Sequence, residues 1–389
     1  MNLIALPLQH LRVDDALPFD LHDAGGRVLM PQGALIADER QLRELIEAAP
    51  LADEAQSRAW RERIERLQQM EEEAPAASDF LPPPGELSPA AEASELPRLL
   101  APLLSQPQSI PHWPPRLEAL ARRVGLAVRA DADALLYLLV QRASRYHERY
   151  SSEHALLCAV VCALVAEPLQ CDETETHALL CAALTMNLSM TALQDELAER
   201  ERTPTLAHRR AIDEHPALSV RQLRLLGVAD ELWLGIVSLH HRQPDPQLPF
   251  AELAPAARLG ATLSRVDVFT AKISARRSRA GLPAPLAARD ACLGPNGLPD
   301  GIGGAMIKAL SIYPPGSYVR LANSEVGVVV QRGARADRPH VVSLLAPNGR
   351  PLPVPLLRDT AQPRNEIKAA VRASDVRVPT NHEQVLGLR

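Results

Sequence analysis

The chain has 389 residues, of which 46% are hydrophobic, 23% are charged and only 3% are aromatic. It is long enough to bury a large core and to form two or three domains. The net charge of −5 and the lack of a long Lys/Arg run exclude a general attraction to nucleic acid or to an anionic membrane surface.

The sequence also carries signals of cellular location. The segment 1–7 lacks the basic start and the small-residue cleavage pattern of a signal peptide. The most apolar run, residues 155–166, is shorter than the roughly 20 residues that cross a bilayer. Five cysteines without framework spacing suit a reducing compartment. We therefore expect a cytoplasmic protein that binds neither membrane nor nucleic acid.

Residues 1–50 alternate short apolar segments with glycine-bearing turns such as Asp23-Ala24-Gly25-Gly26. This alternation predicts a small β-rich N-terminal module. A helix is expected to follow from Asp38, with Leu42, Leu45 and Ile46 on its apolar face.

Residues 51–115 are expected to form a charged helix followed by a proline-rich linker. The helix, within residues 53–73, has one narrow apolar face that could dock a partner or a second copy of the chain. Its apolar residues at helical spacing are Trp60, Ile64 and Leu67. From Pro75 to Pro115 eleven prolines predict extended, semi-rigid backbone and a domain boundary. We favour a spacer over a ligand for a proline-binding domain.

Residues 116–315 have helical periodicity, which predicts an all-helical domain. Within it, Gly301–Gly304 is expected to be a turn before a helix from Ala305 to Leu310. Residues 316–389 contain short β-type runs separated by Asn, Gly and Arg, which predict a small C-terminal sheet. The expected fold class is therefore mainly α: a helical bundle flanked by small β-rich modules.

A series of short blocks, each with a polar residue in mostly apolar surroundings, lies in this helical part. They are His154, Met186-Asn187, Glu214-His215-Pro216, His240-His241 and Asp267. This order, over residues 146–330, resembles the HD-GYP family of cyclic di-GMP signalling proteins. In that family an Ala-Ala-Leu-Leu-His-Asp-Ile-Gly-Lys helix supplies a His-Asp ligand pair, and the matching segment here is Ala182–Met190. The resemblance implies a bundle of the HD superfamily.

The resemblance also implies a metal site. The family binds two or three iron or manganese ions through histidine and aspartate ligands. At the two positions of the His-Asp pair, Met186 offers only a soft thioether and Asn187 offers a neutral amide, so the carboxylate that bridges two metals is missing. We therefore expect no catalytic residues and no cofactor beyond residual Fe or Mn. The remaining ligands, expected to converge on one pocket, are His154, His215, His240, His241 and Asp267.

The substrate side departs from the family as well. The Gly-Tyr-Pro loop is absent after His241, and Met190 replaces the lysine that ends the helix motif. Arg276 and Arg279 match the family's arginine pair, and guanidinium groups bind phosphate well. The other interpretation, which we favour, is a solvated basic helix end.

Cys158 and Cys162 follow His154 at steps of one helical turn, and Cys181 follows His177 in the same way. Such a stripe could hold a metal. We favour small buried core residues instead, because aliphatic residues surround both pairs.

Two main hypotheses follow. The first is a catalytically degenerate HD-GYP-like domain that acts as a bacterial signalling or protein-interaction module, with a protein partner and a capacity to sense cyclic di-GMP without hydrolysis. The alternative is a metal-dependent phosphodiesterase or phosphohydrolase with a rearranged site of His215, His240, His241 and Asp267. The related HDOD class, which also lacks the catalytic pair, fits less well because the His-Pro, His-His and Asp blocks are retained in HD-GYP order.

Overall fold

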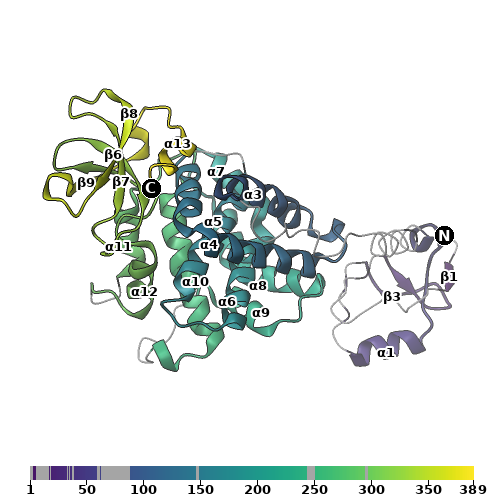
Figure 1. Cartoon of the computed structure of the whole chain (residues 1–389). Helices are drawn as coiled ribbons and strands as arrows, with labels where there is room; N and C mark the ends of the chain where they lie inside the picture. Colours follow the sequence, from purple (N-terminus) through teal and green to yellow (C-terminus); the bar gives the residue numbers. More distant parts are fainter. Residues whose placement is uncertain are drawn as a thin grey trace. The chain divides into compact units, whose positions relative to one another are not determined.

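The computed structural model shows a mainly helical chain with a small antiparallel sheet toward each end (Figure 1), as the sequence predicts. It divides into two compact units, Met1–Ala76 and Ala77–Arg389. The structure describes residues 3–5, 17, 19–32, 34, 36, 39–58, 62, 88–145, 149–242, 250–293 and 297–389.

The N-terminal unit is built on a sheet of order β1-β4-β2-β3, in which all paired strands are antiparallel. The elements are β1 (Leu3–Ala5), β2 (Leu21–His22), β3 (Val28–Met30), α1 (Glu39–Glu47) and β4 (Leu51–Asp53). Leu17, Phe19, Leu21, Ile36, Leu45 and Ala52 form its core. The expected β-rich module is thus confirmed over the described residues. Asp38 and the predicted docking face of Trp60, Ile64 and Leu67 lie outside them.

The second unit is a helical bundle arranged around α5 (Tyr150–Ala166). The other helices are α3 (Pro89–Ser105), α4 (Trp113–Ala143), α6 (Glu173–Thr185), α7 (Thr191–Glu199), α8 (Leu206–Leu225), α9 (Glu231–Leu239), α10 (Pro255–Ile273), α11 (Ala284–Cys292), α12 (Gly301–Leu310) and α13 (His382–Leu386). Of the 17 residues of α5, 15 are buried, because α3, α4, α6, α7, α10 and α12 surround it. A helix that is apolar on all sides is expected at such a central place.

The helix α3 corrects the prediction of extended backbone between Pro75 and Pro115. Pro89 occupies the first turn, where its missing N–H costs nothing, and the Ser88 side chain accepts a hydrogen bond from the Ala91 N–H. Pro97 and Pro102 lie inside the helix. Their cost is offset by burial of an apolar face at helical spacing, which the proline count obscured. That face consists of Ala93, Leu96, Leu100, Leu103 and Leu104.

A second correction concerns Gly301–Gly304, which belongs to α12 and is not a turn before it. Asp300 begins this helix by accepting a hydrogen bond from the Gly303 N–H. A side chain on Gly303 would collide with the carbonyl group of Cys292, since a Cβ atom there would lie 1.8 Å from its oxygen. Close packing against α11 explains why glycine occupies this helical position.

One stretch, Glu173–Glu199, is long and apolar enough to cross a membrane by length and composition alone. It consists of α6, a 3₁₀ turn at Leu188–Met190, and α7. Of its most apolar window, 61% is buried inside the protein. The stretch therefore serves as a core segment of the bundle.

The C-terminal sheet packs on the bundle and shares its core, within the same compact unit. Its antiparallel order is β8-β7-β6-β5-β9. The strands are β5 (Tyr318–Leu321), β6 (Val326–Gln331), β7 (His340–Leu345), β8 (Pro351–Asp359) and β9 (Ile367–Val371). Alternate residues face two cores: Tyr318 and Val328 join that of the bundle, whereas Val319 and Val329 join a separate cluster. The sheet is therefore buried on both faces along β5 and β6.

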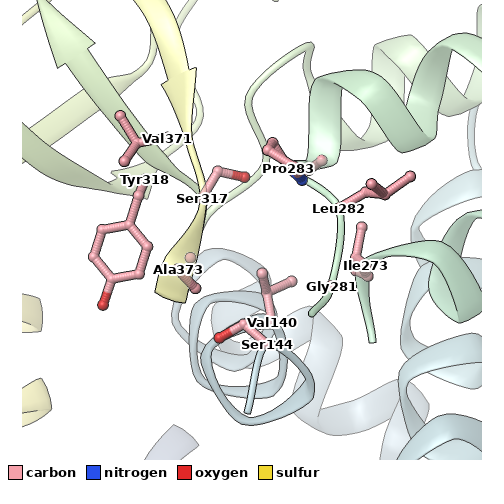
Figure 2. A pocket seen from close by; sticks show the side chains of 12 residues that line it. Val140, Ser144, Ile273, Gly281, Leu282, Pro283, Ser317, Tyr318, Val371 and Ala373 are labelled. Atoms are coloured by element: carbon pink, nitrogen blue, oxygen red, sulfur yellow. The ribbon is translucent and has the colours of Figure 1, made fainter. Parts of the chain in front are cut away.

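Polar contacts fix this sheet to α4. Gln141 donates a hydrogen bond to the Gly316 carbonyl at 2.6 Å and accepts one from the Tyr318 hydroxyl at 2.9 Å. A small cavity lies between α4 and the sheet (Figure 2), with Val140 and Ser144 on its helix side and Ser317 and Tyr318 on its sheet side. The bundle and the sheet thus meet across a partly polar junction.

A buried ion pair holds α3 on α4 and provides a test of the position of α3 in the bundle. Arg123 makes a two-pronged contact with Glu92, at 2.8 and 2.9 Å, and both side chains are less than 5% exposed. Replacing Arg123 by Leu leaves the Glu92 carboxylate buried without this partner, which should lower the free energy of unfolding by about 3–5 kcal/mol in urea denaturation. The double change Arg123→Leu with Glu92→Leu should recover most of this loss.

The neighbouring Arg122, which contacts Glu118 at the surface, provides the control. Arg122→Leu should change the free energy of unfolding by less than about 1 kcal/mol. Equal effects of the two arginine changes would contradict the buried pairing.

Candidate metal centre

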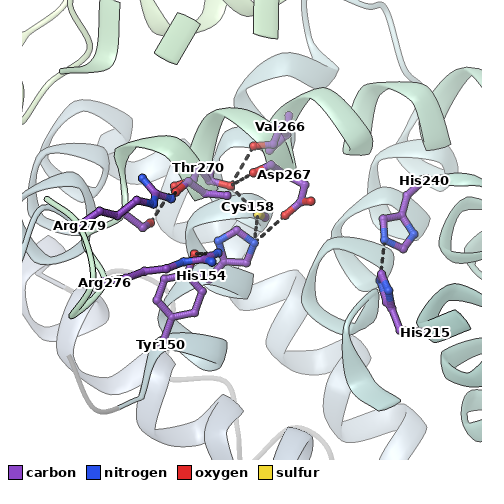
Figure 3. A network of polar contacts seen from close by, with 12 residues as sticks. Tyr150, His154, Cys158, His215, His240, Val266, Asp267, Thr270, Arg276 and Arg279 are labelled. Atoms are coloured by element: carbon purple, nitrogen blue, oxygen red, sulfur yellow. Dashed lines mark hydrogen bonds and ion pairs between the residues drawn. The ribbon is translucent and has the colours of Figure 1, made fainter. Parts of the chain in front are cut away.

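The first group of candidate ligands joins α5 to α10. His154 Nε2 lies 2.7 Å from Asp267 Oδ1 and 3.6 Å from Cys158 Sγ (Figure 3). Cys158 lies one turn after His154 on α5, and its Sγ is 3.0 Å from the hydroxyl of Thr270, which lies three residues after Asp267 on α10. We call His154, Cys158 and Asp267 the His-Cys-Asp set.

Without a metal, this set contains an ion pair. Burial lowers the pKa of His154, but Cys158 and Asp267 outweigh burial and raise it to about 10. Burial raises the pKa of Asp267, but the hydrogen bond and the charge of His154 reverse the direction and leave it lowered. Burial also raises the pKa of the Cys158 thiol. The shifts of His154 and Asp267 have the directions expected of an imidazolium and a carboxylate that stabilise each other's charged form.

The second group brings together the three remaining histidines, which we call the three-His set. His215 lies within α8, while His240 and His241 directly follow α9. The Nε2 atoms of His215 and His240 are 3.1 Å apart, and the three ring centroids lie 4.4–5.0 Å from one another. His215 and His240 are fully buried, whereas His241 is exposed.

Backbone carbonyls orient the two buried rings. Pro216 has no N–H, so it leaves the Ile212 carbonyl, four residues earlier in α8, without its usual helical donor. This carbonyl accepts the hydrogen bond from His215 Nδ1. The Val237 carbonyl, free at the end of α9, accepts one from His240 Nδ1 at 2.7 Å. With both Nδ1 atoms protonated, the neutral rings direct two Nε2 lone pairs at each other.

Burial keeps these two rings neutral. It lowers the pKa of His215 to about 4 and that of His240 to about 3, with a further lowering by the nearby His241. Neutral imidazoles whose Nδ1 protons are held by carbonyls are ready metal ligands. The three-His set therefore has the donor chemistry of a site for one cation.

Met186 and Asn187 lie directly after α6, beside the helices that carry the three-His set. The Trp233 indole N–H donates to the Thr185 hydroxyl at 2.8 Å, which ties the end of α6 to α9. Ser189 donates to the His215 carbonyl at 3.1 Å, which ties the following turn to α8. Met186 is buried and Asn187 is partly buried.

These donors do not fit the carboxylate-bridged centre that the resemblance implies. The described residues form two sets, inside each of which the candidate ligand atoms lie within 4.8 Å of one another. The sets also interact, because the charge of Asp267 acts on His215 and His240. Asp267 is the one carboxylate in them, and His154 binds it because a buried imidazolium and a carboxylate attract each other strongly. Asn187 supplies no charge to join two cations.

Both arginines contact other groups of this chain, Arg276 from a partly buried position and Arg279 from an exposed one. Arg276 donates to the Tyr150 hydroxyl at 3.1 Å, and its guanidinium lies 4.9 Å from the centre of that ring. Tyr150 in turn stacks on His154, with ring centres 5.4 Å apart. Arg279 donates to the Ala271 carbonyl near the end of α10 at 2.6 Å. These contacts favour the helix-end interpretation for Arg279.

The sequence analysis placed Cys158 one helical turn after His154 but favoured a core role for it, and it missed the contacts of Tyr150 and Thr270 with this network. The spacing did contain a signal, since Cys158 follows His154 by four residues and Thr270 follows Asp267 by three. Only the packing of α5 against α10 shows that the two helix faces meet.

Comparison with known proteins finds one solved structure that resembles this chain. It is the HDG“Y”P protein Bd1817 from Bdellovibrio bacteriovorus, with a TM-score of 0.44 and 13% sequence identity. The match covers 79% of this chain and 99% of that one. No protein-family model and no curated protein matches the sequence.

The buried histidines predict a pH dependence in the metal-free protein. Their pKa values of about 4 and 3 lie below the value of about 6.5 in an unfolded chain, so the unfolded state binds more protons below pH 6.5. The free energy of unfolding should therefore fall as pH is lowered from about 6.5 to 4, and this fall should be smaller in a His215→Gln, His240→Gln variant. NMR titration in the presence of a chelator should show both rings neutral at pH 5. Protonation of either ring near pH 6.5 would contradict the geometry.

Proposed function

We propose that this chain carries an HD-GYP-like domain that no longer hydrolyses phosphodiesters and acts as a signalling or protein-interaction module. The order of the His, His-Pro, His-His and Asp blocks in a helical bundle supports the kinship. The observation that carries the loss of activity is the shortage of carboxylates: the two described ligand sets contain Asp267 alone, and His154 holds it at 2.7 Å.

The chemistry explains why one carboxylate is too few. Hydrolysis at a two-metal site uses a bridging ligand to hold the cations about 3.5–4 Å apart and a shared water that becomes hydroxide near neutral pH. The amide of Asn187 offers no negative charge for this bridge, and the thioether of Met186 is a poor ligand for iron or manganese. The chain therefore retains the scaffold without the means to generate the nucleophile.

A second candidate function is a metal-dependent phosphodiesterase or phosphohydrolase with a rearranged site. The facing Nε2 atoms of His215 and His240 favour it, because three imidazoles can hold one cation and leave a position open for water. It lacks a described carboxylate free to act as a base beside that cation, since Asp267 is engaged by His154.

Metal content and turnover separate the two functions. The full chain, purified after supplementation with iron or manganese, should lack a stoichiometric pair of these ions and should not hydrolyse cyclic di-GMP or bis(4-nitrophenyl) phosphate. An active HD-GYP enzyme prepared in parallel controls for metal loading. Turnover with bound iron or manganese would overturn the proposal and establish the enzyme. Binding of intact cyclic di-GMP, measured by calorimetry, would identify the signal as the nucleotide.

Restoring the ligand pair tests the assignment of the two lost positions. Met186→His with Asn187→Asp should raise the iron or manganese content, because the segment is tied to α8 through Ser189 next to His215. Met190→Lys alone, which restores a residue that binds no metal, is the control and should leave the content unchanged. Activity need not return, since the Gly-Tyr-Pro loop is still missing. Unchanged metal content in the double variant would contradict the assignment.

A further inference from the structure

Three different ligand atoms converge between α5 and α10. The imidazole Nε2 of His154, the thiol Sγ of Cys158 and the carboxylate Oδ1 of Asp267 all lie within 4.8 Å of one another. The nitrogen faces both other atoms. The His154 side chain is 1% exposed and that of Asp267 is 24% exposed, so solvent reaches the group at Asp267.

We propose that His154, Cys158 and Asp267 bind one zinc ion, with Cys158 as a thiolate ligand. The proposal goes beyond the proposed function, because a zinc ion held here is compatible with either presence or absence of phosphodiesterase activity. Imidazole, thiolate and carboxylate are the three ligand types that zinc takes in proteins. The fourth position would go to water from the exposed side of Asp267.

The distances are close to those of a tetrahedral site. Bonds of about 2.3 Å to sulfur and about 2.0 Å to nitrogen place these two ligand atoms about 3.5 Å apart. The observed separation of Cys158 Sγ and His154 Nε2 is 3.6 Å. The nitrogen and the carboxylate oxygen should be about 3.3 Å apart in such a site, so Asp267 Oδ1 moves outward from its present 2.7 Å.

The charges of the ligands match the charge of the ion. On binding, the S–H bond of Cys158 and any N–H bond at His154 Nε2 break, the protons leave to solvent, and bonds from zinc to nitrogen, sulfur and oxygen form. The two positive charges of zinc balance the thiolate and the carboxylate. The bound site therefore carries no net charge in the bundle interior, where uncompensated charge is costly.

The thiolate determines which metal is preferred. Sulfur is a soft ligand that favours zinc over manganese or magnesium. The Thr270 hydroxyl, 3.0 Å from Cys158 Sγ, can turn to donate a hydrogen bond to the thiolate and so stabilise its charge. The three-His set contains no sulfur. A metal bound at Cys158 can therefore be told from one bound at the histidines by its spectrum.

Cobalt substitution provides this spectrum. The full chain is stripped with a chelator and titrated with Co²⁺, which takes the same tetrahedral geometry as zinc. We expect thiolate-to-cobalt charge-transfer absorption in the near ultraviolet, which stops increasing once this site is filled with Co²⁺. Addition of zinc should remove the absorption, whereas addition of manganese should not. Absence of this absorption in the wild-type chain would overturn the proposal.

Cys162 provides a matched control. It lies one turn further along α5 and, like Cys158, is fully buried. Cys158→Ala should abolish the charge-transfer absorption, whereas Cys162→Ala and the three-His variant His240→Ala should retain it. Cys158→Ser, which preserves more polarity, should give the same loss, and circular dichroism reports whether each variant is folded. Absorption that survives in folded Cys158 variants would assign the thiolate to another cysteine and overturn the proposal.

Discussion

The ion pair between His154 and Asp267 determines how the polar groups at the centre of the bundle are shared. It joins α5 to α10 at 2.7 Å, in a place where a lone charge would be costly. Because Asp267 binds His154, it belongs to a different ligand set from His215 and His240, whose pKa values are lowered chiefly by burial. The charge of Asp267 still acts on His215 and His240, so the two ligand sets are linked electrostatically.

The surroundings of this pair are built to hold it in place. The helix α5 is buried on nearly all sides, so His154 and Cys158 have little freedom to turn toward other partners. In α8, Pro216 has a comparable role for the three-His set, because its missing N–H frees the carbonyl that orients His215. A proline that looks only disruptive in a helix thus serves to position a side chain. The segment of Met186 and Asn187 is fixed beside it through Ser189.

Predictions of secondary structure from local sequence were wrong in two segments, one rich in proline and one rich in glycine. The eleven prolines between Pro75 and Pro115 predict extended backbone, yet α3 forms there because its apolar face is buried against α4 and because Arg123 pairs with Glu92. Tertiary burial outweighed local propensity at Pro97 and Pro102. The sequence predicts a turn at Gly301–Gly304, but these residues belong to α12. The reason is similar, since small residues allow close packing against α11.

The sequence by itself determined the mainly helical class, the β-rich ends and the order of the polar blocks, because apolar periodicity and turn residues are local properties of the chain. It also determined which donors are missing, since Met186 and Asn187 offer no imidazole and no carboxylate whatever the fold. Only the tertiary structure decided that the face of α5 with His154 and Cys158 meets Asp267 of α10, and that His215 of α8 meets His240 after α9. Those pairings depend on which helix faces meet, and spacing along one helix carries no information about the helix packed against it.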